Sequence, residues 1–382
     1  MKHVLFLGII VCTVVMTGRA QNTAASADTA HIRLLEEKIA ALERRVALID
    51  KANASSASVG GQVFSYFSYT ANNGIEGRDV NRFDFERLYL TVKGAAFNNV
   101  KYQMTTDIFR NAAAGSYYSG LSVRLKFAYL DYTPAPSVSI KAGMIAGPWT
   151  GFIDGYWKYR GISPSFVDRN GYYASADLGL SAQYQLPSGF GDVSAFILNG
   201  SGYAAPEANR FKDVAARITL SPFQGIPVAK NLTLAGYGYK GANQSVTGRA
   251  LQRDRAGVLA GYADAYVSAY AEADRRWDAP SHPDTVVTGN GLSFFGEIKA
   301  PFESIRNTVA LVLRYDIAEP NISKGGDMTR FAIVGLSYRI SEKCQFVLDR
   351  QVQQAESASL KRADNTKTDR DERWMLHALL TF

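Results

Sequence analysis

The last ten residues, from Arg373 to Phe382, constrain the fold of this chain more than any other stretch. Apolar side chains recur there at every second position, which is typical of a strand with one apolar face: Trp374, Leu376, Ala378, Leu380 and Phe382. A tilted strand of about ten residues can cross a bilayer, but each unpaired N–H or C=O group would cost several kcal/mol in hydrocarbon. The strand therefore needs neighbours on both edges, which predicts a closed barrel. The terminal strand of a soluble sandwich is the alternative that this stretch alone leaves open.

The composition fits a β-rich chain. Aromatic residues make up 12% of the 382 residues and charged residues 20%, and after residue 17 no apolar run is long enough for a membrane-spanning helix. Of the two cysteines, Cys12 lies in the predicted leader and Cys344 stands alone, so we expect no disulfide within the chain. The net charge of +7 says little about partners unless the positive groups share one surface.

Residues 1–20 have the pattern of a secretory signal peptide. Lys2 supplies the positive start, residues 4–16 form a short apolar core, and Gly18-Arg19-Ala20 matches a small-x-small cleavage site. We therefore predict that the protein is exported.

Residues 31–51 carry a heptad repeat within a predicted coiled-coil segment at 21–51. The apolar seam has the spacing 3, 4, 3, 4, 3 and consists of Ile32, Leu35, Ile39, Leu42, Val46 and Ile49. The pairs Lys38–Glu43 and Arg45–Asp50 would join neighbouring chains in a parallel bundle. The seam favours dimers, whereas the stretch from Arg45 to Asp50 resembles a short trimerisation motif, and we favour three chains. A lone helix packed on its own barrel is the alternative.

Residues 52–60 read as a small, flexible linker, after which the hydrophobic period changes to two. We expect residues 61–382 to be an all-β, 16-stranded antiparallel transmembrane β-barrel, preceded by the short coiled-coil helix. The predicted strands are 62–70, 81–93, 99–109, 121–133, 138–146, 172–186, 192–199, 211–221, 231–240, 254–263, 265–274, 291–300, 307–317, 330–340, 344–354 and 373–382.

The connections alternate between short and long along the whole barrel. Outer-membrane barrels have short periplasmic turns and long external loops, and an even strand number leaves both termini in the periplasm. No physical constraint requires a soluble sandwich to alternate short and long connections in this way. The alternation therefore favours a barrel in the cell outer membrane, surrounded by outer-membrane lipid.

Basic side chains are expected to face the lumen, because Lys or Arg on the lipid face near the midplane costs roughly 2–4 kcal/mol. The predicted pore-lining set is Arg87, Lys93, Lys101, Arg124, Lys126, Lys141, Arg217, Arg314 and Arg339. Strict alternation in 121–133 places Phe127 and Tyr129 on the lipid face. Rings of Arg and Lys favour anions in pores. A wet wall of mixed charge is the alternative, because Asp107, Asp177, Glu297, Asp316 and Asp349 are also predicted to point inward.

The longest connection, residues 147–171, is unusually aromatic for an external loop. Folding into the lumen would bury these rings and narrow the channel. We predict a constriction formed by Trp149, Asp154, Trp157, Lys158, Arg160 and Arg169. Packing over the rim or onto a neighbouring subunit is the alternative.

Enzymatic readings find little support. The four histidines have no metal-ligand spacing, and no Ser/His/Asp set or phosphate-binding loop can be argued from the pattern. We predict no catalytic residue, no cofactor, no metal and no nucleic-acid partner. A barrel hydrolase with a lipid-facing dyad is the remaining enzyme alternative.

The layout of signal, coiled coil, linker and barrel resembles Gram-negative outer-membrane porins of the phosphate-selective porin O/P type, with the N-terminal coiled coil of DcaP-like porins. The shared motifs are FERLYLTVKG at Phe85–Gly94 and the terminal Phe382. The resemblance implies a homotrimer, a third loop folded into the lumen, and Phe382 as a signal to the barrel-assembly machinery. It also implies a basic ladder for small anionic solutes, whose counterparts here are Arg87, Arg124, Lys126 and Lys141. Phosphate, dicarboxylates and general small solutes all fit.

Two functions are compatible with the sequence. The first is a porin for passive diffusion of small hydrophilic solutes, with a mild preference for anions. The second is an outer-membrane tether whose coiled coil binds peptidoglycan or a periplasmic partner. About 20 helical residues span only about 30 Å, which argues against a tether.

Deletion of residues 31–51 tests the heptad seam. We expect the oligomer to dissociate at a lower temperature, because fewer than three heptads still bury an apolar stripe between chains. Unboiled gel electrophoresis over a temperature series measures this effect. An oligomer as heat-resistant as the full chain would contradict the predicted role of the seam.

Overall fold

The computed structural model describes residues 33–44, 57–70, 80–110, 120–207, 209–357, 359–361 and 367–382. The chain divides into two compact units, residues 1–56 and 57–382. In the first unit a helix covers residues 33–44, within the predicted heptad region. Its seam residues Leu35, Ile39 and Leu42 are 46%, 41% and 58% exposed. The signal peptide and the seam residues Ile32, Val46 and Ile49 lie outside the described residues.

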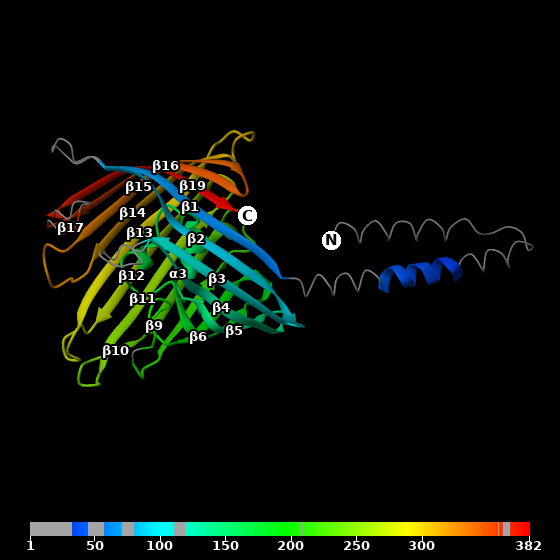
Figure 1. The fold of residues 1–382 in the computed structure, drawn as a ribbon, viewed down its shortest axis with the longest axis horizontal. Helices are drawn as coiled ribbons and strands as arrows, with labels where there is room; N and C mark the ends of the chain where they lie inside the picture. The colour runs from blue at the N-terminus through cyan, green and yellow to red at the C-terminus, as the bar shows by residue number, and fades with distance from the viewer. Residues whose placement is uncertain are drawn as a thin grey trace, which may run out of the picture. The chain divides into compact units, whose positions relative to one another are not determined.

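The second unit is a barrel whose long strands follow one another around a ring (Figure 1). The first eight are β1 (Ser58–Thr70), β2 (Val80–Phe97), β3 (Val100–Arg110), β4 (Leu121–Ala135), β5 (Val138–Ala146), β6 (Ala176–Gln185), β7 (Gly191–Leu198) and β8 (Asp213–Leu220). The other eight are β9 (Leu232–Lys240), β11 (Ala250–Ala263), β12 (Val267–Asp278), β13 (Val287–Lys299), β14 (Val309–Glu319), β15 (Thr329–Ser341), β16 (Cys344–Ala355) and β19 (Arg370–Thr381).

Short elements complete the second unit. Strand β10 (Ala242–Gln244) pairs with the start of β11, and β17 (Leu360–Lys361) pairs with β18 (Lys367–Thr368). Two 3-10 turns, η1 (Pro187–Gly189) and η2 (Ala229–Asn231), lie in short connections. Helices α3 (Thr150–Trp157) and α4 (Phe166–Arg169) lie between β5 and β6.

The barrel closes where its first strand meets its last. β1 pairs antiparallel with both β2 and β19, and the β1–β19 register runs from Gln62–Thr381 to Tyr69–Trp374. Two further backbone bonds between Gly61 and Phe382, of 3.1 and 3.0 Å, extend this seam. The predicted all-β fold, a closed antiparallel barrel of 16 strands, is confirmed.

Burial alternates along β19 as the terminal decapeptide predicts. Met375, His377 and Leu379 point inward and are at most 9% exposed. The apolar residues at the alternate positions face outward and are 42–48% exposed: Trp374, Leu376 and Leu380. The period of two therefore separates an apolar outer surface from the interior.

Several strand ends differ from those predicted. β1 begins at Ser58, inside the stretch predicted as linker. β6 begins at Ala176 rather than residue 172, because the preceding residues belong to the loop; Arg255 Nε donates to the carbonyl of Tyr172 at 2.8 Å. Short links such as 98–99, 136–137 and 342–343 lie at one end of the barrel, which we call the short-turn end, and β19 also stops there. The opposite end of the barrel is called the long-loop end.

Within the described residues, no helix combines the length and apolar character needed to span a membrane.

A charge on the outer face tests the orientation of the wall. Leu336, on β15, is 53% exposed and faces outward, so Leu336→Arg is expected to lower the free energy of unfolding by about 2–4 kcal/mol in a bilayer. Urea unfolding in lipid vesicles measures this change. Val246→Arg in a fully exposed loop position is the control and is expected to have little effect. Equal losses in both variants would contradict the assigned outer face.

Candidate functional site

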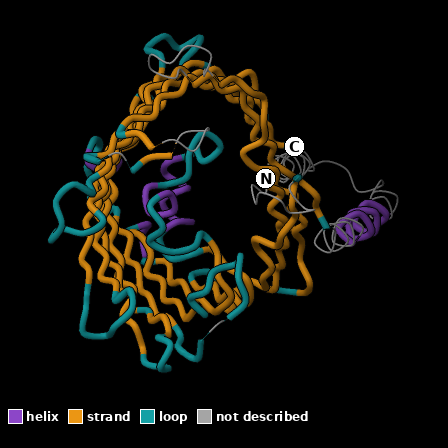
Figure 2. The backbone as a smooth tube through the Cα atoms, turned by 60° about the vertical axis from the view of Figure 1, so that its left-hand side comes forward, coloured by secondary structure: helices purple, strands orange, loops and turns teal. Residues whose placement is uncertain are grey.

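The connection between β5 and β6, residues 147–175, folds into the barrel, and we call it the inner loop. Its helices α3 and α4 lie within the ring of strands (Figure 2). Trp149, Trp157 and Phe166 are 0%, 2% and 1% exposed. Such complete burial of large rings contributes several kcal/mol in total to holding the loop in place. The alternative of a loop lying over the rim does not describe this structure.

Buried acidic residues on one part of the wall attach the inner loop. Trp149 Nε1 donates to Glu272 on β12 at 2.6 Å, and the Tyr159 hydroxyl donates to Glu297 on β13 at 2.6 Å. Glu272 and Glu297 are 2% and 4% exposed. A hydrogen bond to a charged group is stronger than a neutral one, typically about 1.5–3 kcal/mol. The loop is therefore held by directed bonds as well as by ring burial.

Arg314 belongs to this attachment and not to the solvent-accessible part of the interior. It faces inward as predicted, but its side chain is only 1% exposed. It donates to Asp316 at 2.7 Å and to the carbonyl of Pro164 in the inner loop at 2.5 Å. The prediction that Arg314 lines the pore is wrong, because the loop covers it.

Two glycines allow the loop and the wall to approach closely. A Cβ at Gly161 would lie 2.6 Å from Leu379 and 2.8 Å from Phe64. A Cβ at Gly291 on β13 would lie 2.2 Å from the ring of Phe166. Any larger residue at either position would displace the loop from the wall.

Arg160 organises the exposed side of the inner loop. It donates to Asp154 at 2.8 Å and to Asp168 at 2.6 Å. Burial opposes the charge of Arg160, but the two carboxylates outweigh it and raise its pKa well above the usual value. At Asp154 burial dominates over Arg160 and raises the pKa of the carboxyl. The three side chains form a charged cluster facing the strands β2–β4.

The two other basic residues of the inner loop, Lys158 and Arg169, have different surroundings. Lys158 is 53% exposed, with its ammonium 4.0 Å from Glu297. Arg169 stacks on Phe331 at 3.5 Å and donates to Gln353 at 2.7 Å. Burial lowers the pKa of Arg169 to about 10. Arg169 is therefore packed against β15 and β16, where it borders a small hollow of about 140 Å³.

Strands β2–β4 carry a pair of arginines opposite the inner loop. Arg87 and Arg124 share one carboxylate, that of Asp107, at 3.4 and 2.9 Å. Both arginines face inward, yet their side chains remain 27% and 26% exposed. Inward side chains that keep this exposure border space inside the barrel that solvent can reach. Two cations on one fully buried carboxylate leave an excess of positive charge.

A tyrosine at the long-loop end makes a second contact to these arginines. Tyr203, in the loop after β7, accepts from Arg124 at 2.7 Å and donates to Asp107 at 3.1 Å. Burial raises the pKa of Tyr203 to about 12.

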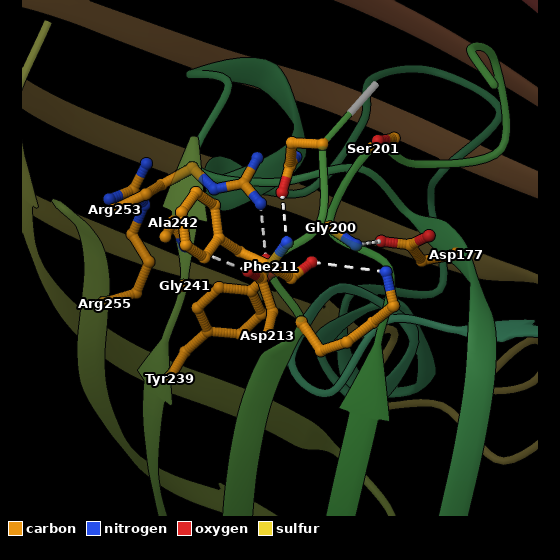
Figure 3. A network of polar contacts seen from close by, with 12 residues as sticks. Asp177, Gly200, Ser201, Phe211, Asp213, Tyr239, Gly241, Ala242, Arg253 and Arg255 are labelled. Atoms are coloured by element: carbon orange, nitrogen blue, oxygen red, sulfur yellow. Dashed lines mark hydrogen bonds and ion pairs between the residues drawn. The ribbon is translucent and has the colours of Figure 1, made fainter. Parts of the chain in front are cut away.

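Buried carboxylates anchor the segments around this loop (Figure 3). Asp177 accepts from the Gly200 amide at 2.7 Å. Asp213 is fully buried and accepts from Tyr239, Arg253 and the amide of Ala242. These bonds hold Gly200 at the start of β6 and join the start of β8 to β9, β10 and β11.

A β-bulge on β4 changes the predicted facing of its residues. Thr105 of β3 pairs with Phe127 and Thr106 pairs with Leu125, so Lys126 is the extra residue. Lys126 points inward, is 4% exposed and donates to the Tyr89 hydroxyl at 3.0 Å. The bulge also turns Phe127 and Tyr129 to the interior, so their predicted lipid facing is wrong.

The other predicted basic residues line the lower lumen, toward the short-turn end. Lys141 lies 3.9 Å from Asp131, and Arg217 lies 3.0 Å from Asp192. In the strand ladders Lys93 is opposite Gln103 and Lys101 is opposite Asp131, which places both on the inward face. Arg339 borders a cavity of about 270 Å³ together with Lys158 and Arg160.

Sequence reasoning missed the acid partners that share the inward positions. Asp131 and Asp192 each lie beside a predicted basic residue, and Glu272 and Asp274 form a buried pair on β12. The signal was available, because Glu272 and Asp274 alternate with alanines in an apolar strand. Among the described residues no group of His, Cys, Asp or Glu is arranged to hold a metal ion.

Arg160→Gln tests the charged cluster. Loss of the guanidinium leaves Asp154 and Asp168 unpaired, which is expected to lower the free energy of unfolding by about 1–3 kcal/mol. Chemical unfolding measures the change. Lys158→Gln removes the same charge from a more exposed site and is expected to cost less than about 1 kcal/mol. Equal costs would show that Arg160 does not organise the loop.

Comparison with known proteins adds evidence on the fold. No protein-family model and no curated protein sequence matches the chain. Among solved structures, an anion-selective porin from Comamonas acidovorans aligns at a TM-score of 0.63 and 12% identity, covering 86% of this chain and 99% of that one. A porin from Rh. blastica, solved as a mutant, aligns at 0.53 and 11%, covering 86% and 100%.

A third solved structure is OmpT, an outer membrane protein of Vibrio cholerae, in its trimer form. It aligns at a TM-score of 0.57 and 10% identity, covering 86% of this chain and all of that one. At such low identities these likenesses bear on the fold alone. The chain has the 16-stranded barrel fold of outer-membrane porins.

Proposed function

We propose that this protein is an outer-membrane porin, a channel for passive diffusion of small hydrophilic solutes. One observation carries the proposal: Arg87 and Arg124 face the inside of a closed barrel and yet remain about one quarter exposed. A barrel of 16 strands is wide enough to enclose an aqueous channel. The inner loop attaches to β8–β16 and also lies against β19 and β1 at Gly161, so the solute path lies between this loop and strands β2–β7.

A mild anion preference follows from the charges along that path. Arg87 and Arg124 share a single carboxylate. In the described part of the chain, Arg339 has no carboxylate within 4.0 Å. By contrast, Lys141 and Arg217 each have an acidic partner, so the positive excess is small. The solved neighbour described as anion-selective supports the same direction.

The proposed assembly is a homotrimer in the outer membrane with both termini in the periplasm. The exposed seam of the helix at 33–44 offers an apolar stripe to other copies of the chain. The trimer form of the OmpT neighbour supports the same number of subunits. Phe382 is 58% exposed at the end of β19, where the barrel-assembly machinery would read it.

Planar-bilayer recording of the purified protein tests the channel. Discrete conductance steps in KCl are expected, with a reversal potential in a salt gradient that shows modest preference for chloride. Absence of steps from correctly folded protein would overturn the channel. Conductance steps with a preference for cations would support the proposed channel but contradict its proposed anion preference.

Charge neutralisation in the lumen tests the proposed path. The double variant Arg87→Gln and Arg124→Gln is expected to shift the reversal potential toward cation preference, because Asp107 then remains without its two cations. Arg275→Gln is the control, because this arginine is exposed on the outer face of β12. A shift of equal size in the control would show that the lumen arginines do not set selectivity.

A further inference from the structure

A hollow of about 420 Å³ lies between the inner loop and the lower part of strands β3–β8. Its volume falls in the range of roughly 300–1,000 Å³ that is typical of small-molecule sites. Four aromatic rings and two cations line it: Phe127, Tyr129, Phe152, Phe196, Lys141 and Arg217. A passage that serves only water and ions needs no such rings, so the lining points to a solute with an apolar part.

The β-bulge on β4 builds the aromatic side of this hollow. If Lys126 were paired regularly and not bulged, the alternation would direct Phe127 and Tyr129 to the lipid. β-bulges commonly re-aim side chains beside functional sites. The hydroxyl of Tyr129 donates to Gln103 at 3.0 Å, which fixes its ring against the hollow. The aromatic wall is therefore held in a defined orientation.

The polar groups of the hollow fit one negative charge. The Lys141 side chain is 34% exposed and only loosely paired, with its ammonium 3.9 Å from Asp131. Arg217 donates to Asp192 at 3.0 Å and to the carbonyl of Pro148 at 3.1 Å, so its terminal nitrogens already have partners. Because each cation has a carboxylate behind it, the local charge is nearly balanced. A multiply charged anion therefore gains little here, whereas a ring can gain from the aromatic wall.

We propose that the hollow is a binding site for planar anions with a single charge, of the class of aromatic carboxylates. The carboxylate lies at Lys141, whose ammonium is 5.3 Å from the centre of the Tyr129 ring, and the ligand ring packs edge-on or offset against Phe127 and Tyr129. This inference deepens the proposed porin function and rests on it for the physiological solute. Binding itself does not require conductance.

Saturation-transfer difference NMR on the detergent-solubilised full chain tests binding directly. Benzoate is the probe. Acetate is the comparison ligand that has the carboxylate but no ring, and inorganic phosphate is the comparison ligand with more than one charge. Benzoate is expected to bind with millimolar affinity. Acetate and phosphate are expected to displace it only weakly. Planar-bilayer recording with added benzoate measures the half-blocking concentration in parallel.

Two variants with matched controls locate the site. Phe127→Ala is expected to raise the benzoate dissociation constant about three- to tenfold, the range typical of aromatic pairs. Its control, Tyr132→Ala, changes an outward-facing ring on the same strand that is 47% exposed. Lys141→Gln is expected to weaken benzoate at least threefold, and Lys101→Gln, which removes an inward charge outside the hollow, is its control.

The outcomes separate the site from the channel. If the protein conducts, and Phe127→Ala and Tyr132→Ala change the benzoate dissociation constant equally, the binding site is overturned and the porin function stands. Benzoate binding that both hollow variants weaken, in a protein that does not conduct, supports the site and overturns the channel. Acetate or phosphate binding as tightly as benzoate also overturns the proposed class of ligand.

Discussion

The structure depends on the absence of hydrogen-bonding partners in hydrocarbon. Each backbone N–H and C=O group of a spanning strand has to bond to a neighbouring strand, so the sheet cannot end at an open edge. The pairing of β1 with β19 removes both edges at once, and the bonds between Gly61 and Phe382 continue it to the last residue. Every other feature of the interior is built inside this closed wall.

The interior is divided into two unlike halves. Strands β9–β16 present buried rings and acids such as Glu272 and Glu297, which take up the aromatic inner loop. Strands β2–β7 present cations that stay partly exposed, such as Arg87 and Lys141. Asymmetric attachment of one loop thus leaves the polar side chains of the opposite wall uncovered, as the proposed channel requires.

Alternation explains which features could be predicted from the sequence. It identified the strands and the inward facing of Glu297 and Asp316, because the lipid surface penalises every error of facing. It failed at Phe127 and Tyr129, since a bulge depends on the partner strand and leaves no periodic signal. Contacts such as Trp149 with Glu272, 123 residues apart, follow from loop packing that no local pattern encodes.

The bulge at Lys126 has a consequence for how such a lumen can change over evolutionary time. A bulge absorbs an extra residue and keeps the facing of the residues beyond it, whereas gain or loss of one residue without a bulge exchanges the inner and outer faces of all residues up to the next turn. A single-codon insertion or deletion can thus replace several interior side chains together, while the number of strands stays the same. The side chains that line such barrels can therefore change abruptly in evolution, while the overall amino-acid composition changes little.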